Sequence, residues 1–233
     1  MSAIRIAVVS IALLISGCAH NINISPDIPS LSQPQPTKSA KSIGYYFIEA
    51  LDKEVTTSGG GGDQVKYKPY RDLATGLYKM YSNLFSGVTQ LNSQAEAGSS
   101  KVDYIAAVGI STSSSSPSLF TWPPTVFTLN LTTDISDVKG NALGNLRASG
   151  EGRAEFSEFK GDHGLSGKRA SQDALNKMQE HTFSAPFFTA NKTTPSGGSA
   201  SKEERLKELK RLFDMGLITE PVLLERQRGI LNQ

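Results

Sequence analysis

The residue with the most distinctive chemistry is Cys18, the only cysteine among 233 residues. One cysteine cannot form a disulfide within its own chain, so the thiol can fill a core, stay free or carry a covalent group. It follows the apolar run Ile6–Ile15 and two small residues, Ser16 and Gly17. A cysteine at the end of such a run favours an attachment point.

A second set of chemically capable residues lies in the glycine-bounded loop at residues 160–168. Asp162, His163 and Ser166 are the residue types of a hydrolase triad. A triad needs its members to converge beside an oxyanion hole, which neighbours within one loop rarely do. The Gly-x-Ser-x-Gly turn of many hydrolases does not occur in the sequence. We predict a protein that is not an enzyme, with no catalytic residue. The alternative is an envelope hydrolase in which these three side chains converge in a pocket.

Metal and phosphate chemistry are not indicated either. The chain has three histidines, His20, His163 and His181, and no Cys/His cluster with the spacing of a zinc site. Gly59–Gly62 could suggest a phosphate-binding loop, but Asp63 follows where such a loop continues into Gly-Lys-Ser/Thr. We therefore predict no metal and no cofactor, and assign the glycines to a hairpin tip.

Residues 1–17 have the layout of a secretory signal, with Arg5 before an apolar stretch too short to span a bilayer. Ile15-Ser16-Gly17-Cys18 resembles the lipobox of bacterial lipoproteins, in which diacylglycerol is attached to the cysteine before the signal is removed. The resemblance implies a lipid anchor at Cys18, and acyl chains hold a residue firmly at a membrane. Ala19 stands where an aspartate would indicate the inner membrane, which implies an outer-membrane protein that faces the periplasm.

Residues 18–41 contain Pro26, Pro29, Pro34 and Pro36 among small polar residues. This composition predicts an extended, mobile tether that holds a folded domain off the membrane. The formal net charge is +2, from 24 basic and 22 acidic residues, and this balance argues against a nucleic-acid partner.

A central domain is predicted over residues 42–190. Apolar residues spaced three and four apart predict a helix over residues 71–91, and a second helix is predicted over residues 167–183. Gly140 and Asn141 predict a hairpin turn. The predicted strands are Ile43–Leu51, Val102–Ile110, Val126–Ile135 and a return strand that ends at Phe156.

This order predicts an α+β fold, a mainly antiparallel sheet with two helices on one face. The order of elements is loosely similar to bacterial periplasmic lipoproteins that are accessory parts of envelope machines, such as the lipopolysaccharide-assembly lipoprotein and the curli secretion lipoprotein. Fold analogy alone does not assign a function.

Trp122, the only tryptophan, precedes Pro123 and Pro124, which hold the backbone extended. Its position fits a residue that caps the core at the entry of a strand. It also fits an exposed contact for a small ligand or an envelope polymer, which is a further alternative function.

After a linker at residues 191–201, residues 202–233 become charged and periodic, which predicts a hairpin of two helices. Gly216 fits the end of the first helix and Thr219 the cap of the second. The candidate contact residues are Leu206, Leu209, Leu212, Phe213, Gly216, Leu217, Ile218, Leu224, Ile230 and Leu231.

Asp214–Glu220, with the sequence DMGLITE, resembles the core of the short C-terminal domain called SHOCT, and Ile230 and Leu231 fit its ending. Pro221 and Leu224 depart from the usual acidic and aromatic residues. The resemblance implies oligomerisation or protein contact without catalysis. The sequence thus predicts a lipid-anchored envelope protein that acts as a binding, scaffold or assembly subunit and contacts itself or another envelope protein through this hairpin.

Overall fold

The computed structural model describes residues 19–31, 37–58, 64–115 and 126–189, and in the C-terminal region residues 206, 209–210, 224 and 227. By its internal contacts the chain divides into two compact units, Met1–Lys192 and Thr193–Gln233. Nearly all of the described residues belong to the first unit.

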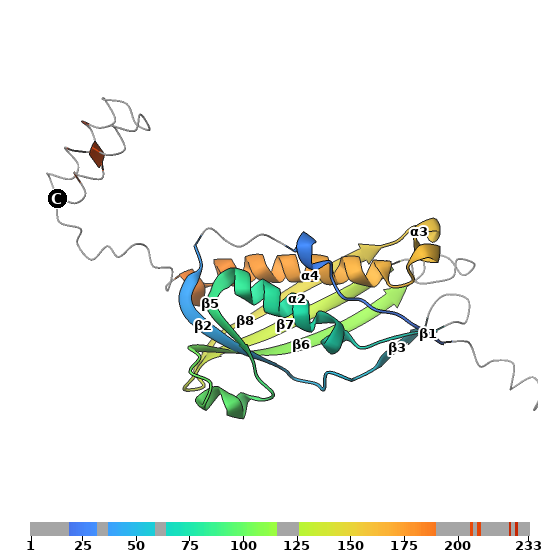
Figure 1. Cartoon of the computed structure of the whole chain (residues 1–233), viewed down its shortest axis with the longest axis horizontal. Helices are drawn as coiled ribbons and strands as arrows, with labels where there is room; N and C mark the ends of the chain where they lie inside the picture. Colours follow the sequence, from blue (N-terminus) through green and yellow to red (C-terminus); the bar gives the residue numbers. More distant parts are fainter. Residues whose placement is uncertain are drawn as a thin grey trace, which may run out of the picture. The chain divides into compact units, whose positions relative to one another are not determined.

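A five-stranded sheet in the order β5-β2-β6-β7-β8 forms the centre of the first unit (Figure 1). Its strands are β2 (Ser39–Phe47), β5 (Phe85–Gln90), β6 (Tyr104–Ser115), β7 (Val126–Asp137) and β8 (Ala142–Arg153). β6–β7 and β7–β8 are long antiparallel pairs, whereas β2 lies parallel to both β5 and β6. The predicted α+β fold is confirmed, and the parallel pairings make the sheet mixed.

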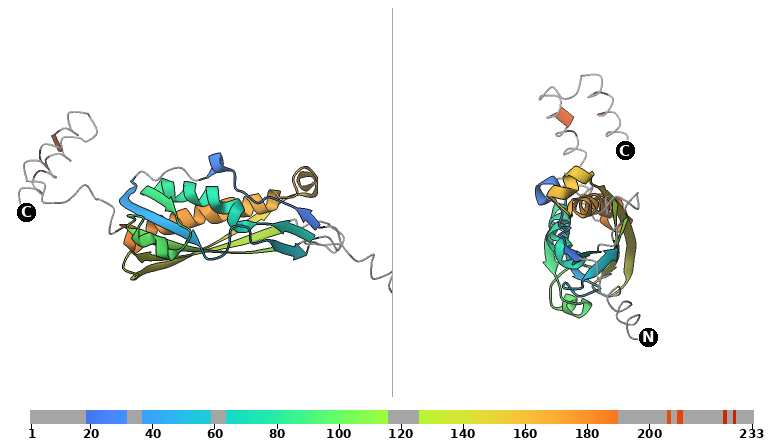
Figure 2. Two further views of the ribbon diagram at one scale, coloured as in Figure 1. Left: turned by 60° about the horizontal axis from the view of Figure 1, so that its bottom comes forward. Right: turned by 90° about the vertical axis from the view of Figure 1, so that its right-hand side faces the viewer.

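Two long helices, α2 (Pro69–Leu84) and α4 (Leu165–Ser184), lie side by side on one face of this sheet, as predicted (Figures 1 and 2). The main core lies between the helices and the sheet, and its largest fully buried side chains include Tyr45, Tyr81, Phe85 and Phe127. The short helical elements are η2 (Ile28–Ser30), η4 (Gln94–Gly98), α3 (Phe156–Gly161) and α5 (Pro186–Thr189).

The apolar stripe of α2 faces the core, with Leu73, Leu77 and Leu84 fully buried. The helix ends at Leu84, however, and the predicted continuation to residue 91 is wrong, because Phe85–Gln90 forms β5. Gly87, Val88 and Thr89 are poor helix formers. In β5 these residues pair in parallel with β2 while Phe85 stays in the core.

A second, three-stranded sheet in the order β1-β4-β3 lies beside the far end of β6, where the Ser114 hydroxyl donates to that of Thr57. Its strands are β1 (Ala19–Asn21), β3 (Val55–Ser58) and β4 (Gln64–Tyr67). β3 and β4 are the antiparallel arms of the hairpin predicted around Gly59–Gly62, while those glycines lie outside the described residues. The predicted turn at Gly140 joins β7 to β8, and its φ of 87° suits glycine.

Helix α4 approaches β8 closely because small residues meet at the contact. A Cβ atom on Gly150 would overlap the carbonyl oxygen of Ala170, and one on Gly152 would overlap the carbonyl oxygen of Ser166. Ala170 and Ala174 on the facing side of α4 are fully buried. The strand glycines therefore set the distance between helix and sheet.

This close approach lets side chains of α4 cover the free edge of β8. An uncovered edge strand exposes unpaired N–H and C=O groups that can pair with another chain. Residues at every fourth position of α4 bond to outward-facing backbone groups of β8, at 2.6–3.0 Å. The bonds run from Arg169 Nη1 to Arg153 O, from the Glu151 N–H to Asp173 Oδ2, from Lys177 Nζ to Ser149 O, and between His181 Nδ1 and Arg147 O.

Candidate functional site

The residue that follows the predicted lipid-attachment site belongs to a strand. Cys18 lies outside the described residues, and Ala19 opens β1. Ala19 pairs with Gln64 of β4 in a parallel register, and the Ile22 N–H donates to the carbonyl oxygen of Lys66 at 2.9 Å. The backbone is thus built into a sheet directly after the position that would carry the lipid.

Residues 22–31, which we call the strap, continue from β1 onto the two long helices (Figure 1). Ile24 is fully buried in the main core and Leu31 is 4% exposed. Farther on, Ser39 is buried and already belongs to β2. The predicted mobile tether over residues 18–41 is therefore wrong for residues 19–31 and for the start of β2, because apolar side chains there join the core.

Glycines on both helices leave room for the strap. A Cβ atom on Gly76 of α2 would lie 2.7 Å from Cγ of Pro26. A Cβ atom on Gly167 of α4 would overlap the side chain of Ile24, and one on Gly164, at the start of α4, would overlap the carbonyl oxygen of Asn23. The strap fits in space that side chains at these positions would fill.

Asp72 fixes the strap to α2 through a buried carboxylate. Oδ2 accepts the Ile24 N–H at 3.1 Å and Oδ1 accepts the Asn23 side-chain amide at 3.2 Å. Burial raises the pKa of Asp72, while the Ile24 hydrogen bond and the charge of Arg71 oppose the rise. Because a buried carboxylate needs such donors, Asp72 and the strap depend on each other.

A cavity of about 690 Å³ opens beside the strap on the outer side of α4. Its lining includes Pro26, Lys168, Arg169 and Gln172. Lys168 pairs with Asp162 at 2.7 Å and Arg169 with Glu158 at 2.9 Å, while the Gln172 amide donates to the Ser30 carbonyl oxygen. Its polar groups thus already hold α3, α4 and the strap together, which gives them a structural role.

The alternative hydrolase residues do not form the arrangement that a triad needs. The Asp162 carboxylate accepts the Gly164 N–H at 2.9 Å and pairs with Lys168, instead of orienting His163. Burial alone would raise the pKa of Asp162, but these two donors lower it. The exposed ring of His163 packs on Phe159, with centroids 4.6 Å apart, while Ser166 is 2% exposed.

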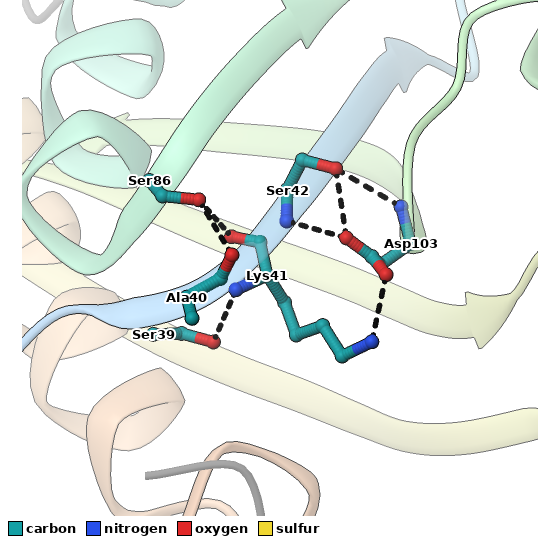
Figure 3. Close-up of polar contacts among 6 residues, drawn as sticks. All are labelled: Ser39, Ala40, Lys41, Ser42, Ser86 and Asp103. Atoms are coloured by element: carbon teal, nitrogen blue, oxygen red, sulfur yellow. Dashed lines mark hydrogen bonds and ion pairs between the residues drawn. The ribbon is translucent and has the colours of Figure 1, made fainter. Parts of the chain in front are cut away.

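The most connected polar cluster on the sheet surrounds Asp103 at the start of β6 (Figure 3). Its carboxylate pairs with Lys41 Nζ at 2.8 Å and accepts both the backbone N–H and the hydroxyl of Ser42 at 2.9 Å. The Lys41 contact and the Ser42 N–H lower the pKa of Asp103, and the same ion pair raises the pKa of Lys41. The ion pair keeps Lys41 protonated, and a carboxylate whose pKa is lowered is a weak base for the Ser42 hydroxyl, so the cluster lacks an activated nucleophile.

This cluster instead holds β2 beside β5 and β6. The Ser86 hydroxyl from β5 donates to the carbonyl oxygens of Ala40 and Lys41, where the β2–β5 register shifts (Figure 3). A register shift leaves backbone groups outside the regular ladder, and side chains satisfy them here. The cluster therefore has a structural role.

The other predicted contact residues are mostly beyond the described part of the chain. Trp122 lies outside it, as do Leu212, Phe213, Gly216, Leu217, Ile218, Ile230 and Leu231. Leu206, Leu209, Lys210, Leu224 and Gln227 are helical. The side chain of Leu224 is 49% exposed.

Within the described ranges, no cluster of three or more histidine, cysteine or carboxylate side chains is placed to bind a metal ion. Among the same residues, no helix is long and apolar enough to cross a membrane.

The strap and the strand glycines were not predicted from the sequence. Asn21-Ile22-Asn23-Ile24 alternates polar and apolar residues, which is typical of a half-buried strand, but the prolines that follow obscured it. Gly150 and Gly152, two residues apart, face the same side of β8. Glycines at this spacing within a strand indicate a close approach of another backbone.

No family model matches the sequence, and no curated protein matches it. Among solved structures, the chain is similar to a Xanthomonas campestris protein described under the family model DUF330. The two are 10% identical, the match covers 78% of this chain and 99% of that one, and the TM-score is 0.42. A minor lipoprotein from Acinetobacter baumannii is 16% identical over 61% of this chain and 91% of its own, with a TM-score of 0.34. Neither similarity is close enough to assign a family.

Proposed function

We propose that this protein is anchored to the outer membrane by lipid at Cys18, faces the periplasm, and acts there as a non-catalytic binding, scaffold or assembly subunit. The supporting observation is that Ala19, the residue after the lipobox cysteine, lies in β1 and pairs with β4. Removal of residues 1–17 would leave Cys18 as the first residue of a chain whose next residue is already part of β1. A lipid on Cys18 would therefore be attached directly beside a residue that belongs to a sheet.

The carboxylates that could act in catalysis are already bound in ion pairs, which supports a non-catalytic role. The carboxylates of Asp162 and Asp103 are both held by lysines. These ion pairs stabilise loops and strand ends, and they occupy the charges that a general acid or base would need.

Replacing the anchor cysteine tests the proposal directly. In the unchanged protein extracted with detergent, intact mass spectrometry should give the mass of residues 18–233 plus diacylglycerol and an amide-linked acyl chain. Cys18→Ser should leave the signal uncut and the mass unmodified, because a hydroxyl cannot replace the thiol as lipid acceptor. Ser16→Ala keeps the cysteine and a small residue, and serves as the matched control. An unmodified Cys18 in the mature protein would contradict the proposal.

We further propose that the C-terminal unit mediates self-association. Two short helices bury little apolar surface alone, and chains below about 40 residues usually need a partner or a staple. The half-exposed Leu224 fits such a contact. Leu206 and Leu209 are helical, which is consistent with the predicted first helix of the hairpin.

Light scattering tests this part of the proposal. A protein that begins at residue 19 should form a defined oligomer, and the same protein without residues 201–233 should be a monomer. If both are monomers, self-association is wrong, and contact with a different protein becomes the function to test. Leu224→Ser should weaken the oligomer in the longer form, whereas Lys210→Ser, on an exposed polar position, should leave it intact.

A further inference from the structure

The two ends of the first unit differ in a way that bears on how a lipid at Cys18 would orient it. One end, which we call the anchor end, is formed by the start of β1, the β3–β4 arms, the last residue of β6 and the first of β7 (Figures 1 and 2). Its reference residues are Ala19, Thr57, Gln64, Ser115 and Val126.

A continuous set of pairings connects β1 to the tip of the β6–β7 pair. Ala19 lies opposite Gln64, which lies opposite Ser58. The Ser114 hydroxyl of β6 donates to the Thr57 hydroxyl at 2.8 Å, and Ser115 pairs with Val126 of β7. Each step joins neighbouring strands, so the residue after Cys18 has a fixed position relative to Ser115 and Val126.

The last described residues of the unit lie at the opposite end. Thr189 ends α5, and the ring of Phe187 in this helix packs on Tyr104, with centroids 5.7 Å apart. Tyr104 is the first residue of β6, and Ser115 is the last. At about 3.3 Å per residue, the eleven steps from Tyr104 to Ser115 place these ends about 36 Å apart.

β6 and β7 are uncharged over an unusual length toward the anchor end, whereas β8 ends there at Arg153, opposite Val126, with its guanidinium paired to Glu151 at 2.7 Å. From Tyr104 to Thr133 the sequence contains no Asp, Glu, Lys or Arg, although these make up 20% of the chain. Ser111, Ser113 and Ser115 are exposed on β6. On β4 the charge nearest this end is Lys66, which pairs with Glu54 at 3.6 Å. An uncharged hydroxyl surface can approach a bilayer without desolvating unpaired charge.

We propose that the anchor end lies against the membrane surface, so that β6 and β7 extend away from the bilayer and α5 lies on the far side. The inference rests on the proposed lipid at Cys18. One residue spans at most about 3.6 Å, so lipid on Cys18 holds β1 within one residue of the headgroups. The anchor end would contact the same bilayer in which the acyl chains insert.

Energy transfer from site-specific labels to labelled lipids tests the orientation. Single cysteines are introduced at Ser115, at the anchor end, or at Lys139, in the exposed β7–β8 turn at the other end. The lipidated full chain is reconstituted in vesicles of phosphatidylethanolamine and phosphatidylglycerol that carry a headgroup acceptor. The sulfur of Cys18 is blocked by lipid and is not labelled. Transfer should be several-fold higher from position 115 than from position 139, and equal transfer would overturn the proposal. Gln64→Cys supplies a second anchor-end label should Ser115→Cys fold poorly.

A charge variant tests whether this surface contacts the headgroups. In protein labelled at Gln64→Cys, the double change Ser113→Glu and Ser115→Glu should lower transfer, because two carboxylates are repelled by phosphatidylglycerol. Lys139→Glu, at the far end, should leave transfer unchanged. If both variants behave alike, contact at this surface is wrong.

Mass spectrometry of the same samples separates this inference from the proposed anchor. Unlipidated protein would contradict the proposed function itself. Lipidated protein with equal transfer at both ends would leave the anchor intact and reject only the orientation.

Discussion

Gly152→Ala is expected to lower the free energy of unfolding by about 3 kcal/mol or more, because one methyl group would have to displace a helix. The new Cβ would overlap the carbonyl oxygen of Ser166 and the backbone nitrogen of Ala170. Both belong to the backbone of α4, which cannot move aside by changing a rotamer. Relief of the overlap would therefore require α4 to separate from β8 along its length.

A matched control lies on the same strand. A Cβ on Gly144 would meet the Phe187 ring at 3.7 Å, which is ordinary van der Waals contact. Thermal unfolding of a protein that begins at residue 19 should show a midpoint lowered by about 10 °C for Gly152→Ala. Gly144→Ala should differ from the unchanged protein by a few degrees. Equal midpoints for the two variants would mean that α4 is not held as closely to β8 as described.

A second expected result of Gly152→Ala shows whether the substitution displaces α4 from β8 or only changes the backbone freedom of the strand. Displacement of α4 would break the side-chain bonds that cover the β8 edge, since Arg169 and Asp173 lie beside the contact on the same helix. Gly152→Ala should therefore also increase association of the folded protein at high concentration. Gly144→Ala leaves those bonds in place and should not.

The long helices of the first unit could be predicted from the sequence because the spacing of their apolar residues is a local pattern. Leu73, Leu77 and Met80 recur at helical spacing, and all three face the core. The end of α2 was not readable, since Phe85 and Val88 continue that spacing in a segment that forms β5. The choice of strand over helix depends on pairing with β2, about 45 residues earlier in the chain.

The parallel pairings could not be read for the same reason. β5 lies beside β2, and the cluster that holds them combines Lys41, Ser42, Ser86 and Asp103 from three separate segments. Residues such as these look like ordinary surface residues in sequence. Their roles exist only after the strands have met.

The prediction of a mobile tether near the N-terminus was wrong because it relied on the proline content of the segment and not on its alternation of polar and apolar residues. Pro26 and Pro29 are compatible with a chain outside long helices and strands, and the strap is such a chain apart from the short helix η2, but this does not mean that it is detached from the core. Whether Ile24 is buried depends on Gly76, Gly164 and Gly167, which are distant in sequence and make space for the strap. A single sequence gives no means of matching a side chain to a remote space. The predictions for Cys18 and the C-terminal hairpin rest on short local motifs and stay predictions.

Ile24→Ala is expected to cost about 2–5 kcal/mol of stability, the range for removing a buried isoleucine side chain. Ile24 is fully buried and belongs to the main core, so its loss leaves a cavity beside Gly167 of α4. The backbone bond from residue 24 to Asp72 remains, so the effect reports packing of the strap. Ile48→Ala provides the matched control, because Ile48 is 60% exposed and should change stability by about 0.5 kcal/mol or less.

Hydrogen exchange in the native protein distinguishes local release of the strap from general weakening. The amides of residues 22 and 24 donate to Lys66 and Asp72, and in Ile24→Ala they should exchange much faster than the amides of β7. If Ile24→Ala costs no more than Ile48→Ala and leaves these amides unchanged, the strap does not support the fold and residues 19–31 act as a tether after all. If Ile24→Ala releases the strap as expected, the strap of the unchanged protein is part of the fold. Any force applied through Cys18 then passes directly into β1 and the two helices. A lipid attached there would then fix the position of the folded unit rather than only its distance from the membrane.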